Sequence, residues 1–193
     1  IGSPMFEVFR KYAKEIQSSK ILEKMSLTEA GYILVSMHRQ ENVDSMTRLS
    51  QVIESINSLA VDYNLPVVIS MHPRTREKIN QSGSKFSEKI IEHEPFGFID
   101  YMKLQKEAFC VLSDSGTISE ESAMMKFPAV SIRTSTERPE AIDAGSLVLG
   151  GIKKQQVLNA ISVCLQTYNT DNLTLPWEYQ IKDVSSRVIR TIQ

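Results

Sequence analysis

The stretch Phe109-Cys-Val-Leu-Ser-Asp-Ser-Gly-Thr-Ile-Ser-Glu-Glu-Ser122 decides the fold of this chain. Its first residues, 109–112, are apolar and predict a short buried strand. A hydroxyl-rich turn with one glycine, Gly116, follows, and helical spacing begins after it. Thr117 and Glu120 have the spacing of a capping box at the helix start. A strand, turn and helix in this order predict an anion site, because the first amides of a helix point outward. The alternative is a helix N-cap without a ligand.

The same alternation of strand and helix runs through the whole chain. Apolar runs predict six strands, at residues 32–38, 67–72, 89–92, 109–112, 128–133 and 146–149. Helical spacing predicts the elements between and around them, at residues 5–22, 44–59, 73–79, 100–108, 117–125, 136–145, 153–168 and 177–192, with Asp44 capping the second and a polar loop at 169–172.

This alternation predicts an α/β fold, a doubly wound parallel sheet with helices on both faces. If the strand order is the common 3-2-1-4-5-6, the first and fourth strands lie side by side. Ligands of such sheets bind in the crevice between the carboxyl ends of those strands. The hydroxyl-rich turn ends the fourth strand, so it should line that crevice.

Two of the three histidines, His38 and His72, end predicted strands at this edge of the sheet. Arg39 follows His38, and Arg133 ends the fifth strand. Basic side chains gathered at the switch point favour an anionic ligand. A strand-end histidine is also a common hydrogen-bonded structural residue, and that reading stays open for both. The third histidine, His93, is expected off this edge, near a loop, with a structural role.

Composition narrows the possible functions. The 193-residue chain has a formal net charge of −1 and 41% hydrophobic residues, as one globular domain would. Nothing in this balance predicts binding to nucleic acid or to a membrane, and no apolar run has the length of a membrane span. No signal peptide is recognisable. The two cysteines, Cys110 and Cys164, fall in apolar patterns, which indicates buried thiols and a reducing, cytoplasmic location.

Three other kinds of site fit this edge less well. A metal site built on the two histidines lacks carboxylate or cysteine ligands at matching spacing, so no metal is expected. A nucleophilic Ser115 would need a catalytic triad, and its flanks lack the Gly-x-Ser-x-Gly elbow. The turn after the first strand has no glycine-rich dinucleotide fingerprint, which argues against NAD.

Four motifs in order resemble one known family. They are Met37-His-Arg-Gln-Glu-Asn42, His72-Pro-Arg-Thr75, Ser113-Asp-Ser-Gly-Thr-Ile-Ser-Glu-Glu121 and Thr136-Glu-Arg-Pro-Glu140. Together they are similar to the C-terminal half of the non-hydrolysing UDP-N-acetylglucosamine 2-epimerases. The resemblance implies a two-domain GT-B enzyme with its active site between Rossmann-like domains. It also implies that residues 1–193 are the second domain alone, with the N-terminal domain absent.

Two features resemble one branch of that family. Thr117 stands where glucosamine epimerases usually carry a second glycine, and residues 95–101 are typical of the branch acting on 6-deoxy-L-hexosamines. The resemblance to this branch implies that the product is UDP-N-acetyl-L-fucosamine, used for capsule or O-antigen.

The resemblance also assigns roles to residues. His38 matches the active-site histidine near the sugar and diphosphate, and Glu121 matches the carboxylate that binds the ribose hydroxyls. The remaining positions match contacts to the nucleotide sugar: Arg39, His72, Phe96, Tyr101, Arg138 and the diphosphate cradle Ser115, Gly116 and Thr117. Two simpler roles stay open, since Glu121 could only support a helix turn and Arg138 could only pair with a neighbouring glutamate.

The implied reaction is elimination of UDP to a 2-acetamidoglycal, followed by re-addition. It needs no cofactor, and the family's carboxylates for proton transfer at C2 come from the other domain. The partners are therefore a UDP-sugar and the absent domain, and the full-length protein is expected to be a homodimer. Two competing functions remain, the donor-binding domain of a GT-B glycosyltransferase and a non-catalytic nucleotide-sugar-binding module.

Overall fold

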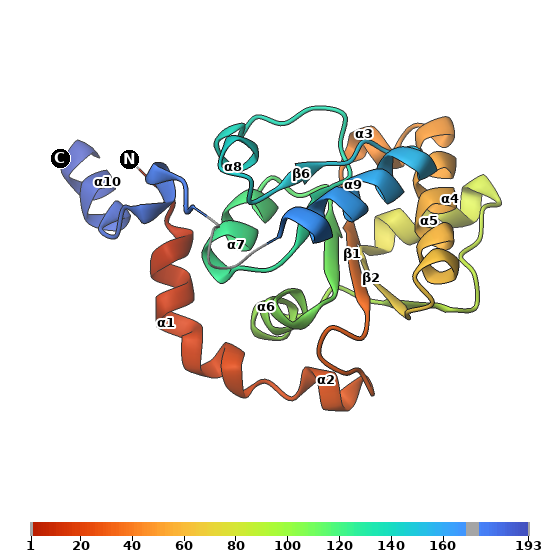
Figure 1. The fold of residues 1–193 in the computed structure, drawn as a ribbon, viewed down its shortest axis with the longest axis horizontal. Coiled ribbons are helices and arrows are strands. Elements are labelled where there is room, and N and C mark those ends of the chain that lie inside the picture. Colours follow the sequence, from red (N-terminus) through yellow and green to blue (C-terminus); the bar gives the residue numbers. More distant parts are fainter. Residues whose placement is uncertain (1, 169–173, 193) are drawn as a thin grey trace.

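The sheet has the predicted strand order. The computed structural model describes residues 2–168 and 174–192. Six strands, all parallel, run in the order β3-β2-β1-β4-β5-β6 (Figure 1). Their bounds are β1 Ile33–Met37, β2 Val67–Met71, β3 Ile90–His93, β4 Cys110–Ser113, β5 Ala129–Ser131 and β6 Val148–Leu149. The doubly wound α/β fold predicted from the sequence is confirmed, and β1 and β4 are neighbours.

Helices cover both faces of this sheet. Their bounds are α1 Met5–Ser18, α2 Ile21–Lys24, α3 Gln40–Val43, α4 Met46–Asp62, α5 Pro73–Ser82, α6 Phe98–Glu107, α7 Ile118–Met125, α8 Glu140–Asp143, α9 Lys154–Thr167 and α10 Val184–Ile192. Buried residues of α4 and α9 share a core with one face, and those of α6 and α7 share a core with the other. No helix of the described ranges is long and apolar enough to cross a membrane.

The sequence of β1 shows why the sheet is buried on both sides. Ile33 and Val35 point into the core shared with α4 and α9, whereas Leu34 points into the core shared with α6 and α7. All three side chains are fully buried. A parallel strand covered on both faces needs an uninterrupted apolar run, and this strand has one.

A polar row crosses the sheet where the strands end. Ser36 of β1 pairs with Ser70 of β2 and with Ser113 of β4, and Ser113 pairs with Ser131 of β5. His93 of β3 continues the row, because it pairs with Ser70. The expectation that His93 lies off this edge is therefore wrong: β3 runs to His93 itself, one residue beyond the apolar run that predicted the strand.

Two predicted helix caps are wrong. Ser45, not Asp44, caps α4 by accepting a hydrogen bond from the Arg48 N–H. Asp44 instead accepts two hydrogen bonds, both 3.0 Å, from Arg74. At α7 the Thr117 side chain makes no cap bond. Its hydroxyl lies 2.9 Å from that of Ser115, which also accepts the Thr117 N–H at 3.3 Å, so the turn uses the earlier serine.

Two predicted helices are each broken in two. Residues 5–22 form α1 and α2, separated at Ser19, whose backbone is extended and whose hydroxyl donates to Asp100 at 2.5 Å. Residues 177–192 form a 3-10 helix, Trp177–Gln180, and then α10. Between them Ile181 packs against Gly2, which leaves only 2.8 Å between the Ile181 Cβ and an added glycine Cβ. The predicted polar loop at 169–172 lies outside the described residues.

Helices α1 and α10 lie together at one side of the molecule, away from the sheet (Figure 1). The Glu7 carboxylate of α1 accepts hydrogen bonds from the N–H and the hydroxyl of Ser185 in α10, at 3.1 and 2.5 Å. Helix α10 leaves Val188, Ile189 and Ile192 exposed, at 38%, 56% and 79% of their surface. We call these three side chains the α10 apolar face.

Candidate functional site

Asp114 joins the end of β1 to the turn after β4. Its carboxylate is fully buried and accepts hydrogen bonds from the backbone N–H groups of His38 and Arg39, at 3.1 and 3.0 Å. The Asn42 amide donates a third bond at 3.2 Å. A buried carboxylate is stable only with such donors, so these bonds fix where the chain leaves β1. The arrangement brings the predicted histidine and the predicted anion turn together.

His38 is held by its ring as well as by its backbone. Its Nδ1 lies 3.3 Å from Asp114 Oδ1, and half of its side chain is exposed. Because an ionised carboxylate only accepts hydrogen bonds, this contact assigns a proton to Nδ1. The ring can then offer Nε2 to a ligand. Sequence reasoning gave Asp114 no role, although its place between two serines at a strand end was the available signal.

The turn after β4, Ser115 to Thr117, which the sequence predicts as a diphosphate cradle, is held by hydrogen bonds of its own hydroxyls and of the Ser113 hydroxyl. The hydroxyl of Ser115 bridges to Thr117, and the Ser115 N–H donates to the Ser113 hydroxyl at 3.1 Å. The guanidinium of Arg39 lies next to Gly116, since a Cβ added at Gly116 would be 3.5 Å from Arg39 Nη2. A cation beside a hydroxyl-rich helix start suits an anionic ligand.

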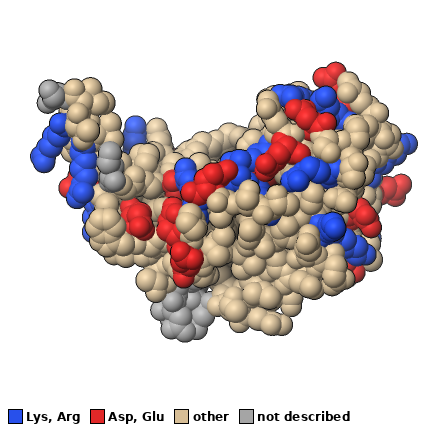
Figure 2. All heavy atoms as spheres, turned by 90° about the horizontal axis from the view of Figure 1, so that it is seen from above, with Lys and Arg blue, Asp and Glu red and all other residues tan. Residues whose placement is uncertain are grey.

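Glu137 lies between two arginines next to this cradle. It accepts two hydrogen bonds, of 2.8 and 2.6 Å, from Arg133, which is only 2% exposed. Arg39 approaches the same carboxylate to 3.6 Å. The hydrogen bonds from Arg133 are the main cause that lowers the pKa of Glu137 to about 2. Seen from above, acidic and basic side chains are mixed along this side of the molecule (Figure 2).

Arg138 pairs with a neighbouring glutamate, as one of the two readings of the sequence had it. Its guanidinium forms a salt bridge with Glu120, and Glu120 also accepts a hydrogen bond of 2.5 Å from the Ser3 hydroxyl. This contact explains why Glu120 does not close a capping box. A guanidinium has five N–H donors, so the pairing leaves Arg138 able to contact a ligand as well.

Glu121 is a buried carboxylate one turn into α7, only 6% exposed. Gln105 of α6 donates a hydrogen bond of 2.7 Å to it. Burial is the main cause that raises the pKa of Glu121, and hydrogen bonds from Gln105 and Thr117 oppose this rise. Glu121 is therefore linked directly to the cradle through Thr117.

Two aromatic residues predicted to contact the nucleotide line the same side. Tyr101 is half-buried, and its burial raises its pKa, while hydrogen bonds with Ser36 and Gln105 oppose the rise. Phe96 stacks on His93 with ring centroids 4.0 Å apart and an interplanar angle of 8°. The stacked pair extends the site toward the end of β3.

His72 has a local role. It is exposed, and its Nδ1 accepts a hydrogen bond of 3.3 Å from the Arg74 N–H, which caps α5. Within residues 2–168 and 174–192 there is no group of three or more His, Cys, Asp or Glu residues that could hold a metal ion.

A cavity of about 510 Å³ opens elsewhere, between β6 and α9, with Arg133 on its wall. We place the candidate site at the cradle instead, because the cradle has the convergent polar groups and the histidine.

Comparison with known proteins agrees with this arrangement. The family described as UDP-N-acetylglucosamine 2-epimerase matches residues 1–193. A UDP-N-acetylglucosamine 2-epimerase of Methanocaldococcus jannaschii is 32% identical over 163 residues, covering 78% of this chain and 44% of that protein. The structure of the Rickettsia bellii UDP-N-acetylglucosamine 2-epimerase has a TM-score of 0.86 and 36% identity, covering 99% of this chain and 52% of that one.

A further structure adds a ligand. The Methanocaldococcus jannaschii UDP-GlcNAc 2-epimerase was solved in complex with UDP-GlcNAc and UDP, and it matches with a TM-score of 0.87 and 27% identity. The match covers all of this chain and 53% of that one. The chain thus spans about half the length of the relatives it matches.

Proposed function

Because this chain belongs to the UDP-N-acetylglucosamine 2-epimerase family, we propose that it is the UDP-binding half of a UDP-N-acetylhexosamine 2-epimerase. The observation that carries the proposal is the bonding of Asp114, which places His38 and Arg39 at the cradle formed by Ser115 to Thr117. The diphosphate of a UDP-sugar is the anion that this cradle would receive.

In this proposal, the residues of this chain stabilise negative charge during the reaction. When UDP leaves C1 of the sugar, charge grows on the diphosphate, and fixed donors aimed at it lower the barrier. The guanidinium of Arg39 supplies such donors at the turn, where the N–H groups of Ser115 and Thr117 already donate to the hydroxyls of Ser113 and Ser115. His38, with Nδ1 held by Asp114, would present Nε2 toward the bond that breaks and can donate or accept a proton there.

The remaining residues recognise the nucleoside and the sugar in this proposal. Glu121 accepts hydrogen bonds from the ribose hydroxyls, and Arg138 reaches the sugar-phosphate region beside Glu120. Phe96, whose ring stacks on His93, would contact the uracil through its backbone, and Tyr101 would lie beside the base. His72, after the end of β2, lies further along the same edge, and its Nδ1 already accepts the Arg74 N–H, so a contact with the ligand would use its Nε2.

The N-terminal half of such an enzyme would supply the groups that move the C2 proton. The relatives are about twice as long as this chain, which fits an active site shared between two halves. We propose that the intact enzyme is a homodimer. We also propose that it works in the cytoplasm, and the two free buried thiols, Cys110 and Cys164, support a reducing compartment.

We further propose a 6-deoxy-L-hexosamine as the substrate, with UDP-N-acetyl-L-fucosamine for capsule or O-antigen as the product. The support is Thr117, which adds a side chain whose hydroxyl lies 2.9 Å from that of Ser115 where a glycine has none, together with the sequence of residues 95–101. One relative, of Pseudomonas aeruginosa, carries the name UDP-2,3-diacetamido-2,3-dideoxy-D-glucuronate 2-epimerase, so the family is not confined to one sugar.

Two experiments test the proposal. The 193-residue chain is titrated with UDP and with AMP by calorimetry, and UDP should bind the more tightly. The full-length enzyme is incubated with each candidate UDP-sugar, and UDP with free 2-acetamidoglycal should accumulate slowly. Transfer of the sugar to an added acceptor, with no glycal, would instead identify a glycosyltransferase. Binding of UDP without either reaction would leave a non-catalytic binding module.

A further inference from the structure

Gln105 lies behind the proposed ribose site. It comes from α6, and it is fully buried. Its Nε2 donates to Glu121 Oε2 at 2.7 Å. The carboxylate accepts and cannot donate when ionised, so the amide must turn its NH₂ group toward it. Gln105 also hydrogen-bonds to Tyr101, the residue that lies beside the proposed uracil position.

This orientation leaves the other end of the amide unsatisfied. Gln105 Oε1 is buried and has no hydrogen-bond partner within the described residues. Such an atom is uncommon in a folded protein and needs a reason. The reason here is that the NH₂ group of the amide faces the Glu121 carboxylate, so the oxygen of the same amide points elsewhere and is left without a partner in the described part of the chain. The unpaired acceptor is the consequence of using this amide as a donor to Glu121.

Glu121 needs this donor because it is buried. Burial favours the neutral form of a carboxyl group, and a neutral carboxyl would bind the ribose hydroxyls less well. Two hydrogen bonds favour the charged form, one from Gln105 and one from Thr117. One comes from behind the carboxylate and the other from the cradle, so together they fix the direction in which its remaining acceptor sites point.

We infer that Gln105 is a positioning residue, which sets the preference of this site for a ribonucleoside diphosphate over a diphosphate without ribose hydroxyls. The inference rests on the proposed function, because it uses the assignment of Glu121 to the ribose. Gln105 touches no ligand itself. It acts through the orientation of Glu121 and, at the base, of Tyr101.

The test is calorimetry of the 193-residue chain with three ligands: UDP, 2′,3′-dideoxy-UDP and inorganic pyrophosphate. Gln105→Leu keeps the volume and removes both donors. We expect it to lower the affinity for UDP about tenfold, the worth of one hydrogen bond. The affinities for the dideoxy compound and for pyrophosphate should stay within about twofold of wild type, since neither uses Glu121. The exposed Gln155, changed to Leu on α9, is the matched control and should bind like wild type.

The possible results separate a positioning role of Gln105 from a purely structural role, and both from a failure of the proposed function. An equal loss for all three ligands would mean that Gln105 supports the fold, and would overturn the inference. Wild-type UDP affinity in Gln105→Leu, with a loss in Glu121→Ala, would overturn it and leave the proposed function intact. If Gln105→Leu does not fold, Gln105→Glu is judged by the same three ligands. A wild-type chain that binds pyrophosphate as well as UDP would count against the proposed function itself.

Discussion

Asp114 holds His38 at two atoms, the backbone N–H and the ring Nδ1, although the two residues are 76 positions apart in the chain. The carboxylate accepts the His38 backbone N–H through both oxygens, at 3.1 and 3.2 Å, and lies 3.3 Å from Nδ1 of its ring. The same bonds that close β1 against β4 therefore also orient the ring. Folding of this edge and preparation of the site are one event.

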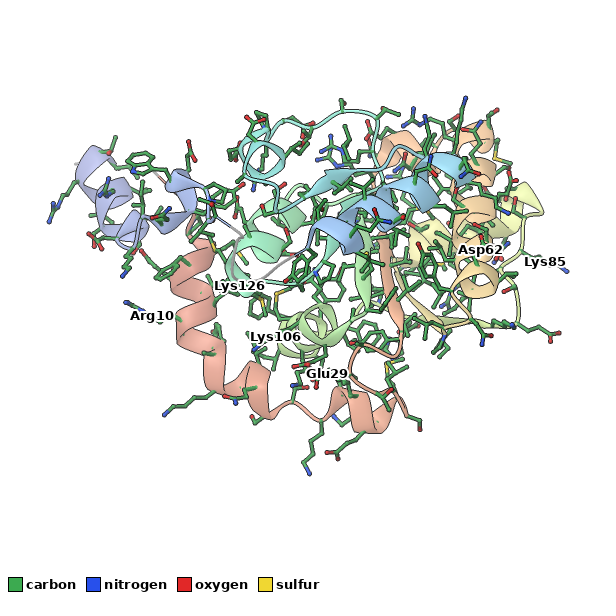
Figure 3. The ribbon with its side chains drawn as sticks, in the orientation of Figure 1. Arg10, Glu29, Asp62, Lys85, Lys106 and Lys126 are labelled. Carbon is green, nitrogen blue, oxygen red and sulfur yellow. The ribbon has the colours of Figure 1, made fainter. Side chains whose placement is uncertain are left out.

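Asp114→Asn should destabilise the chain and weaken UDP binding. The amide keeps one acceptor oxygen but turns an NH₂ group toward donors, so a buried backbone N–H loses its partner, at a cost of about 1–3 kcal/mol. Urea denaturation measures the stability, and calorimetry measures the binding. The exposed Asp62 at the end of α4, labelled in Figure 3, gives the control variant Asp62→Asn, which should behave as wild type. Unchanged stability of Asp114→Asn would contradict the role of this carboxylate.

Glu121→Ala should weaken nucleoside recognition but not diphosphate binding. The ribose hydroxyls would lose a charged acceptor, worth roughly 1.5–3 kcal/mol. Calorimetry with UDP and with pyrophosphate separates the two effects. The control is Glu29→Ala, an exposed carboxylate on the lower side of the molecule (Figure 3). Equal losses for both ligands would show that Glu121 acts on the fold.

Glu137 should make the fold sensitive to acid. Its pKa is about 2 in the folded chain, against an ordinary value of 4.5. A lowered pKa stabilises the folded state above the unfolded pKa, and this contribution is lost as pH falls from about 4.5 toward 2. Because Glu137 is exposed, solvent screening keeps the effect small. Melting temperatures measured across this range should fall less steeply in Glu137→Gln than in wild type, while Glu88→Gln, a control at an exposed carboxylate, keeps the wild-type slope.

The 193-residue chain should bind UDP but not epimerise a UDP-N-acetylhexosamine. The cradle, Glu121 and Arg138 are all present, whereas water reaches a diphosphate that no second domain covers. Glu41, the carboxylate within the histidine motif, lies 3.5 Å from Arg133 Nε and pairs with that arginine. NMR in deuterated water follows the C2 proton. Exchange at the rate of the full-length enzyme would place the base within this chain.

The fold was predictable because its signals are local or topological. Each buried strand is an apolar run, and the strand order follows from a rule about doubly wound sheets. Helix breaks were not predictable in the same way. Ser19 interrupts its helix to reach Asp100, and Ile181 turns inward to pack on Gly2, so both breaks depend on contacts across the fold.

The site was predictable only at residues whose type alone indicates a function. The histidine His38 and the glycine turn stand out in the sequence, but Asp114 and Gln105 do not. Their importance lies in which donors and acceptors face them, and these come from β1, α6 and α7 together. The prediction for His93 failed for a smaller reason, a strand boundary misplaced by one residue.

The α10 apolar face has a practical consequence for anyone who prepares this chain. Three aliphatic side chains are in contact with water on one short helix, and Trp177, seven residues before α10, is 71% exposed. Exposed apolar side chains gathered in this way favour association between molecules. When two molecules bury such surfaces against each other, water is released and the free energy falls. The associated fraction therefore increases with protein concentration. Hydrophobic association weakens on cooling and strengthens on warming. We therefore expect concentrated solutions of this chain to aggregate on warming before dilute ones do.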